Sequence, residues 1–182
     1  GCENIESTRN LETTCSGGEV DEEYLATVGG CQIINGDLNI DGWERSPPHL
    51  DNLQSVTRII GSLRIRNTTG LGIFDYLSAL KEVTVPIGNN STAIEIVNNR
   101  GLTEIQIPYL ERVTSENSMR IIITDNPELG MKESMALKLY YSAHGKHHTR
   151  IQYKDKTTFW DGNIFKLVKK ISKYCVEGCS RY

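Results

Sequence analysis

The sequence lacks any long apolar run and any strong excess of charge. A membrane-spanning helix needs about 18 consecutive apolar residues, and neither such a run nor the shorter apolar core of a signal peptide is present. We therefore expect a mature form, an excised ectodomain or a cytosolic protein, with no membrane span. The net charge of −3 provides no basic field, which argues against nucleic acid or an anionic membrane as the main partner.

Recognisable catalytic and cofactor motifs are missing as well. The chain has no G-x-S-x-G elbow, no G-x-x-x-x-G-K-S/T loop, no H-E-x-x-H pair and no G-x-G-x-x-G turn, which argues against the common hydrolase, nucleotide and metalloprotease sites. His144, His147 and His148 cluster in one segment, but no Asp, Glu or Cys stands at ligand spacing beside them. We expect a solvated loop there, no metal, no cofactor and no enzyme activity.

Cysteine is scarce and lies only toward the two ends of the chain. No two cysteines have the C-x-x-C spacing of a zinc site or a thioredoxin-like centre. Cysteines grouped in this way fit disulfides that close a secreted domain better than buried free thiols, and their odd number leaves one thiol over. The positions are Cys2, Cys15, Cys31, Cys175 and Cys179.

The middle of the chain repeats a nine-residue phrase: apolar, any, apolar, any, Asn or Asp, three further residues and a last apolar one. Alternation with period two indicates strands with one buried face. One such layer cannot bury its own apolar edge, so neighbouring layers must stack. We predict an α/β fold, a right-handed β-solenoid of the leucine-rich-repeat type, in preference to an ordinary β-sandwich. Copies begin at Leu63, Ile94 and Ile121, with a looser one at Leu38, and should place Ile65, Ile96 and Ile123 in one interior column.

A second apolar series runs out of phase with the first and supplies another short stretch in each layer. Its copies are Leu53-x-x-Val56, Leu80-x-x-Val83 and Leu110-x-x-Val113. Each strand of the first series is followed by an Asn or Asp whose side-chain oxygen we expect to accept backbone N–H groups in a turn. These residues, the Asx column, are Asn67, Asn98 and Asp125.

Glycosylation sequons begin at Asn67, Asn89 and Asn90, and they favour secretion. Asn67 poses a conflict, because a side chain buried in the Asx column cannot carry a glycan. Asn89 and Asn90 lie in a polar loop. We expect one glycan there rather than two, since neighbouring glycans obstruct each other.

Both ends of the chain are typical of caps that close a stack of layers. We expect one structural domain in three parts: an N-terminal segment and capping helix at 1–30, the layers at 31–130, and a helical cap with the terminal cysteines at 131–182. Trp43 and Pro47-Pro48 mark an insertion that is either a packing plug or a contact loop. The elements expected in the caps are a helix from Glu19 to Val28, a helix over 131–141 stopped by Gly145, a short strand with Ile151 and Tyr153, and a last helix starting at Asp161-Gly162-Asn163.

Three phrases together resemble the receptor L domain, the leucine-rich solenoid of insulin and epidermal-growth-factor receptors and of many nematode secreted proteins. The resemblance covers the chain from about Cys15 to its end. The phrases are Cys31-Gln-Ile33-Ile34-Asn-Gly36-Asp-Leu38-Asn-Ile40, then Leu53-x-x-Val56-x-x-Ile59-Ile60-Gly61-Ser-Leu63-x-Ile65 followed by Gly70-Leu71, and finally Asp125-Asn126-Pro127-Glu128-Leu129.

The resemblance also implies a disulfide scheme. In the family a cysteine followed by x-Gly pairs with the cysteine before the first layer, which implies a Cys15–Cys31 bridge. A second bridge starts just after the closing turn, but Gly130 occupies that position here. Cys175 and Cys179 must then pair with each other, with Cys2, or outside the chain, and a disulfide-linked dimer is one expectation.

The resemblance implies an extracellular module, secreted or part of an ectodomain, that binds a protein or peptide: an insulin-like peptide, a growth factor or a receptor ectodomain. The alternative is a secreted parasite effector, or a structural or adhesive surface glycoprotein, that binds host proteins. Residues flanking the buried apolar pairs should point outward in columns. A competing interpretation is a solvated face in which Arg64 and Glu95 only pair with each other. The candidate ligand-binding residues are Asn39, Asp41, Arg64, Arg66, Glu95, Val97, Arg120, Ile122 and Thr124.

Overall fold

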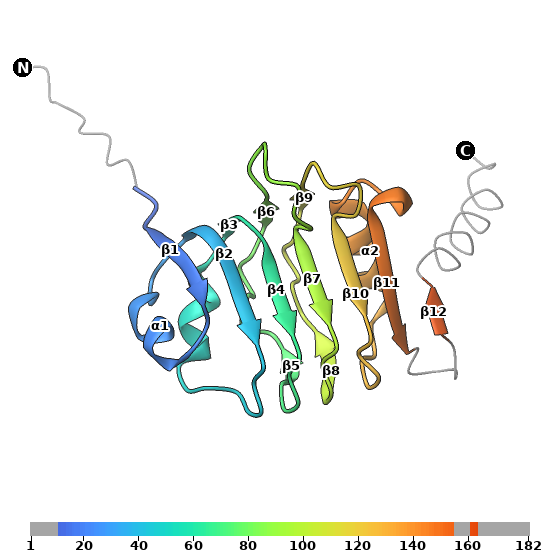
Figure 1. Cartoon of the computed structure of the whole chain (residues 1–182), viewed down its shortest axis with the longest axis horizontal. Coiled ribbons are helices and arrows are strands. Elements are labelled where there is room, and N and C mark those ends of the chain that lie inside the picture. The colour runs from blue at the N-terminus through green and yellow to red at the C-terminus, as the bar shows by residue number, and fades with distance from the viewer. Residues whose placement is uncertain (1–10, 155–160, 164–182) are drawn as a thin grey trace, which may run out of the picture.

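The computed structural model describes residues 11–154 and 161–163, and its main feature is a set of short parallel strands (Figure 1). None of the described helices is long and apolar enough to cross a membrane. In chain order the elements are β1 (Thr14–Glu19), α1 (Glu22–Thr27), β2 (Ile33–Asp41), the 3-10 helix η1 (Leu50–Ser55), β3 (Arg58–Ile60), β4 (Leu63–Arg66), β5 (Gly72–Phe74), β6 (Glu82–Thr84), β7 (Ile94–Val97), β8 (Leu102–Ile105), β9 (Arg112–Thr114), β10 (Ile121–Thr124), α2 (Glu133–Ser142), the 3-10 helix η2 (Lys146–His148), β11 (Thr149–Lys154) and β12 (Asp161–Asn163).

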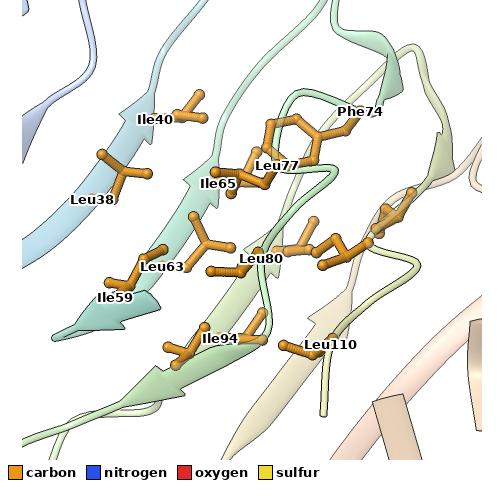
Figure 2. Close-up of a cluster of buried hydrophobic side chains, with 14 of the residues drawn as sticks. Leu38, Ile40, Ile59, Leu63, Ile65, Phe74, Leu77, Leu80, Ile94 and Leu110 are labelled. Carbon is orange, nitrogen blue, oxygen red and sulfur yellow. The ribbon is translucent and has the colours of Figure 1, made fainter. Parts of the chain in front are cut away.

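The strands of the nine-residue phrase stack side by side. All their inward side chains are fully buried, and each contributes about 1.5–3 kcal/mol of hydrophobic free energy. Figure 2 shows several of them pointing into a shared interior. The predicted interior column is confirmed, and the parallel pairing argues against an ordinary sandwich of antiparallel strands. The strands involved are the second half of β2 and the whole of β4, β7 and β10. Their register places Leu38, Leu63, Ile94 and Ile121 in one column, and Ile40, Ile65, Ile96 and Ile123 in the next.

A second run of parallel strands starts from the same β2, whose first half pairs with β3, followed by β6 and β9. This register confirms one step of the predicted second series, because Val83 pairs with Val113. It contradicts the other step, in which Val56 aligns with Val83, because Ile59 pairs with Val83. Val56 instead corresponds to Leu80, and each donates its N–H to the carbonyl of the residue three positions before it. Apolar residues recur at every third position here, so a shift of three residues still matches apolar with apolar. The observed column is Ile34, Ile59, Val83 and Val113.

Glycine allows β2 to belong to both runs of strands. Gly36 and Gly61 have φ angles of 128° and 153°, a region that side chains disfavour. Gly61 packs so closely against the Gly36 carbonyl that a Cβ atom would overlap it, and Gly17 packs in the same way against the Asp37 backbone. These glycines form a corner at which the chain turns from one run of strands to the other.

A separate two-stranded parallel sheet is formed by β5 and β8. It buries Phe74 and Ile105 in the same apolar core as the longer runs. The described fold is therefore a predominantly parallel α/β arrangement around one interior. The right-handed closed coil with helical caps at both ends stays a prediction.

The N-terminal segment is part strand and part helix. The helix expected from Glu19 begins later, because Glu19 ends β1, which pairs in parallel with β2. Asp21 caps α1 by accepting the Tyr24 N–H at 2.8 Å. Leu25 and Val28 are buried, as their helical spacing predicts.

A disulfide and a tryptophan tie this segment to the layers. Cys15 and Cys31 are bonded, with Cα atoms 6.0 Å apart, which confirms the pairing that the resemblance implied. Trp43 is half-buried against the core, and its Nε1 donates to the Val20 carbonyl at 3.0 Å. These contacts favour the packing plug over the contact loop. Cys2, Cys175 and Cys179 lie outside the described residues.

The C-terminal segment agrees with prediction in its first elements. α2 is followed by Gly145 with a φ of 105°, and β11 buries Ile151 and Tyr153. The expected helix start at 161–163 is wrong, since these residues form β12, which pairs antiparallel with β11. The free edge of β11 offers backbone partners that a helix there would leave unused. The rest of the expected last helix, 164–182, lies outside the described residues.

Candidate functional site

The outward side chains of β2, β4, β7, β10 and β11 form one continuous surface, which we call the outer face. They are exposed or half-buried, because strand residues alternate between the interior and the outside. In Figure 1 neither α1 nor α2 crosses the front of these strands, and α2 lies behind β10 and β11. Eight of the nine predicted residues lie together here, and Arg120 directly precedes β10. One column holds Asn39, Arg64, Glu95, Ile122 and Arg150, and the next holds Asp41, Arg66, Val97 and Thr124.

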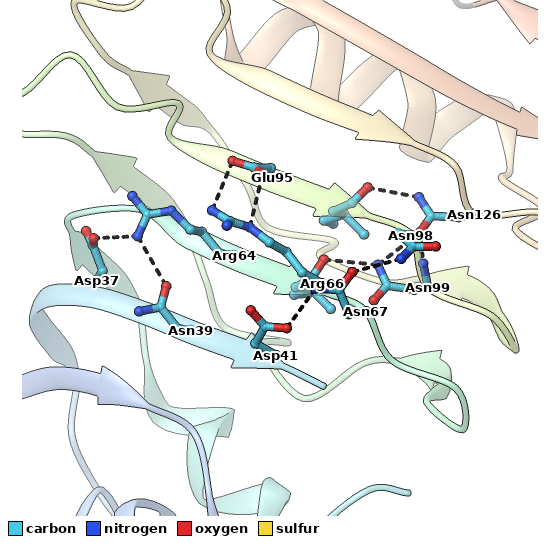
Figure 3. Close-up of polar contacts among 12 residues, drawn as sticks. Asp37, Asn39, Asp41, Arg64, Arg66, Asn67, Glu95, Asn98, Asn99 and Asn126 are labelled. Atoms are coloured by element: carbon cyan, nitrogen blue, oxygen red, sulfur yellow. Dashed lines mark hydrogen bonds and ion pairs between the residues drawn. The ribbon is translucent and has the colours of Figure 1, made fainter. Parts of the chain in front are cut away.

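Arg64 is held by side chains of β2. Its Nη1 lies 2.6 Å from Asp37 Oδ2 and donates to Asn39 Oδ1 at 3.2 Å (Figure 3). Asp37 Oδ1 accepts the Ser62 N–H at 2.8 Å. Burial raises the pKa of Asp37, but the Ser62 hydrogen bond and the Arg64 guanidinium outweigh it, so this pKa lies below its ordinary value. The expected pairing of Arg64 with Glu95 is wrong, because Arg64 pairs with Asp37; whether the face is only solvated or binds a ligand stays a prediction.

The Glu95 carboxylate is instead bound by Arg66. Nε of Arg66 lies 3.0 Å from Oε1 in an ion pair without a hydrogen bond, and Nη2 donates to Oε2 at 3.3 Å. The two side chains are 34% and 25% exposed. Solvent therefore screens the pair, which contributes about 0–1 kcal/mol. With Arg64 and Arg66 each paired, the β4 part of the outer face is nearly neutral.

A shallow hollow of about 300 Å³ opens on the outer face beside β1, β2 and β4. At its rim Asn39 Nδ2 donates to Glu19 Oε1 at 3.0 Å. The hollow presents guanidinium donors and carboxylate acceptors together, which suits a polar side chain of a partner better than an apolar one. Its lining residues are Glu19, Asn39, Ile40, Asp41, Arg64 and Arg66.

The Asx column lies at the ends of the strands and is exposed. Its members have left-handed backbone, with φ angles of 54°, 59° and 58° for Asn67, Asn98 and Asp125, which Asn and Asp tolerate better than most residues. Asn98 Nδ2 donates to Asn67 Oδ1 at 2.8 Å, and Asn67 Nδ2 donates to Asp41 Oδ1 at 2.9 Å. The expectation that Asn67 and Asn98 accept backbone N–H groups is wrong, because their side chains bond to one another.

The residue after the Asx column makes those backbone bonds instead, in what we call the buried ladder of Thr68, Asn99 and Asn126. Asn99 Oδ1 accepts the Thr68 N–H at 3.2 Å and the Thr68 hydroxyl at 2.9 Å. Asn126 Oδ1 accepts the Asn99 N–H at 3.0 Å and Asn99 Nδ2 at 2.9 Å. Sequence reasoning missed this ladder, although the second Asn of Asn98-Asn99 and of Asp125-Asn126 was a visible signal.

The sequon asparagines Asn67, Asn89 and Asn90 are all exposed. Asn67 belongs to the Asx column without being buried, so the expected conflict between column and glycan does not arise. Asn89 Oδ1 accepts the Ser91 N–H at 3.1 Å and the Ser91 hydroxyl at 2.6 Å. The Asn90 carbonyl accepts a bond from Asn117 at 2.9 Å. Glycosylation at these positions stays a prediction.

The histidine segment shows backbone contacts. His148 Nδ1 lies 2.8 Å from the Ser118 carbonyl oxygen. Within residues 11–154 and 161–163, no three His, Cys, Asp or Glu side chains gather as the ligands of a metal ion would.

A known protein family shares the pattern of the layered region. The family model described as Receptor L domain matches residues 30–141, which is more than half of the 182 residues. The matched range contains the nine candidate residues, the Asx column and the buried ladder. No curated protein matches the chain.

Proposed function

The chain belongs to the receptor L domain family, and on this basis we propose that it binds a protein or peptide ligand on its outer face. The family consists of binding modules rather than enzymes. The observation that carries the proposal is a sheet face that neither α1 nor α2 covers, on which half-exposed Val97 and Ile122 lie beside Arg66 and Arg150. Arginine and buried apolar anchors dominate the energetics of protein interfaces.

The ligand we propose is an insulin-like or growth-factor-like polypeptide, or a receptor ectodomain, met outside the cell. Support for that location comes from the Cys15–Cys31 disulfide, since disulfides persist in oxidising compartments. The exposed sequon asparagines are consistent with it. We also propose that the layers, 31–130, form a right-handed solenoid between caps at 1–30 and 131–182.

A direct binding titration of the full chain tests this function. The panel contains insulin-like peptides, growth-factor polypeptides and receptor ectodomains, and calorimetry measures the binding of each. Thr124→Arg on the outer face should weaken saturable binding by about tenfold or more, because it places a bulky charge in the interface. Thr114→Arg is the matched control, a half-buried strand threonine on β9 outside the outer face.

Two results would remove the proposal. One is the absence of saturable binding to every member of the panel. The other is binding that Thr124→Arg leaves as strong as in the wild type, since the ligand would then contact another surface.

A further inference from the structure

The two ends of the outer face differ in how their arginines are matched by carboxylates. Toward β2, Arg64 and Arg66 each contact a carboxylate. Toward β11, neither Arg150 of the outer face nor Arg120, which directly precedes β10, contacts a carboxylate of the described residues. Among residues 11–154 and 161–163, positive charge on the outer face is therefore unmatched at one end.

Arg120 is positioned by α2 but is incompletely bonded. Its Nη1 donates to the Ala143 carbonyl at 3.2 Å, and Ala143 is the C-cap of α2, where the helix dipole favours a cation. Its Nε is buried and has no hydrogen-bond acceptor. A buried donor without an acceptor is unfavourable, so the guanidinium is held by the Ala143 carbonyl but has no carboxylate partner among the described residues.

Arg150 is exposed on β11 and pairs in register with Ile122 of β10. Strands lie about 4.8 Å apart and rise about 3.3 Å per residue, which places the Cα atoms of Arg120 and Arg150 about 8 Å apart on a diagonal. Ile122 is half-buried and lies beside both. This part of the molecule therefore has two cations that meet no carboxylate of the described residues, with one half-buried apolar side chain beside them.

We propose that this end of the outer face binds an acidic segment of a polypeptide. An Asp or Glu carboxylate would lie between Arg120 and Arg150, with an adjacent apolar side chain on Ile122 and Val97. The inference rests on the proposed function and names the chemistry of its partner. A polypeptide fits better than a sulfated polysaccharide, because these two cations flank an isoleucine and the arginines of β4 are already paired.

Peptide selection tests the charge preference directly. The probe is a phage-displayed library of random dodecapeptides panned on the full chain. We expect the selected peptides to be enriched in Asp or Glu next to a large apolar residue. Synthetic versions should bind Arg150→Glu about tenfold or more weakly, since the reversal replaces attraction with repulsion. Arg112→Glu, an exposed arginine on β9, is the matched control and should have no effect.

A charge swap makes the test specific. A peptide whose acidic residue is replaced by Lys should bind Arg150→Glu more tightly than it binds the wild type. Circular dichroism melts of each variant check that the fold is kept. Peptides that lose binding with Ile122→Asp or Thr124→Arg yet bind Arg150→Glu normally would overturn the acidic preference and leave the proposed function standing.

The remaining outcomes also decide the matter. Peptides insensitive to Ile122→Asp and to Thr124→Arg contradict the outer face as the binding site and so the proposed function itself. Recovery of no peptide counts against both the acidic preference and the proposed function. A heparin oligosaccharide that binds the wild type but not Arg150→Glu, with no acidic peptide selected, assigns the site to polysaccharide and overturns the inference.

Discussion

The buried ladder leads to a prediction about two adjacent asparagines, Asn98 and Asn99. Asn99 is fully buried and uses all the bonding capacity of its amide. Its oxygen accepts both the N–H and the hydroxyl of Thr68, and its nitrogen donates to the Ile65 carbonyl at 3.0 Å and to Asn126 Oδ1 at 2.9 Å. We expect Asn99→Ala to be far more destabilising than Asn98→Ala.

The size of the difference follows from the groups left unpaired. Asn99→Ala leaves two buried Thr68 donors without an acceptor, and each costs about 1–3 kcal/mol, or about 2–6 kcal/mol together. Asn98 is exposed and loses one side-chain bond to Asn67, together with the preference of Asn for left-handed backbone. That loss is about 1 kcal/mol. Asn98→Gly should cost still less, because glycine adopts this backbone freely.

Urea and thermal unfolding followed by circular dichroism measure these effects. For a chain of this size about 1 kcal/mol corresponds to a Tm change of about 2–4 °C. We expect Tm to fall by about 5–20 °C in Asn99→Ala and by about 2–4 °C in Asn98→Ala. In the double variant Thr68→Val/Asn99→Ala the combined loss should be smaller than the sum of the single losses, because one of the orphaned donors is gone. Equal losses in the two single variants would refute the idea that the buried ladder joins the layers.

Three further predictions concern the glycine corner between the two runs of strands, the disulfide, and the loss of stability at acid pH. Gly61→Ala should lower the free energy of unfolding in urea by about 2–4 kcal/mol, because the new Cβ would overlap the Gly36 carbonyl. Gly42 has a φ of 71° and lies in open space, so Gly42→Ala should lower it by about 1 kcal/mol. Equal losses would contradict the close approach of Gly61 to Gly36. Cys15→Ser should lower unfolding free energy by about 3 kcal/mol relative to the oxidised wild type, since the bridge closes a loop of 16 residues, and an unchanged urea midpoint would argue against this contribution. The native pKa of Asp37 is lowered, so the native state binds fewer protons than the unfolded chain. The contribution of Asp37 to stability is therefore present above about pH 3.9 and is lost as pH falls through the native pKa. Asp37→Asn should flatten the dependence of unfolding free energy on pH from about pH 5 to about pH 2, and an unchanged slope would contradict this assignment.

The first apolar series could be predicted in register, and the second only in its last two copies, where Val83 pairs with Val113. In the first, a slip of one residue would turn Ile65 and Ile96 outward, so alternation allows a single solution. In the second, apolar residues recur every three positions, and Val56 matches Val83 as plausibly as it matches Leu80. Only the pairing of Ile59 with Val83 decides between them.

The outer face could be predicted in its membership but not in its contacts. Strand alternation places Arg64 and Arg66 outward, but both side chains are long enough to reach carboxylates on either neighbouring strand. The outcome depends on Asp37, which a backbone N–H orients toward Arg64. The different roles of Asn98 and Asn99 could not be predicted either. Residue type alone does not say which of two adjacent asparagines takes the left-handed turn and which is buried.

The interior and the outer face make separate contributions to free energy. Inward side chains such as Ile65 contribute about 1.5–3 kcal/mol each, and Asn99 satisfies buried polar groups between the layers. The solvent-screened pair of Arg66 and Glu95 contributes at most about 1 kcal/mol. Substitution of Arg66 should therefore change which partners the face attracts far more than whether the chain folds. Folding places little demand on these charges, so the proposed ligand would give a role to Arg150, which pairs with no carboxylate of the described residues.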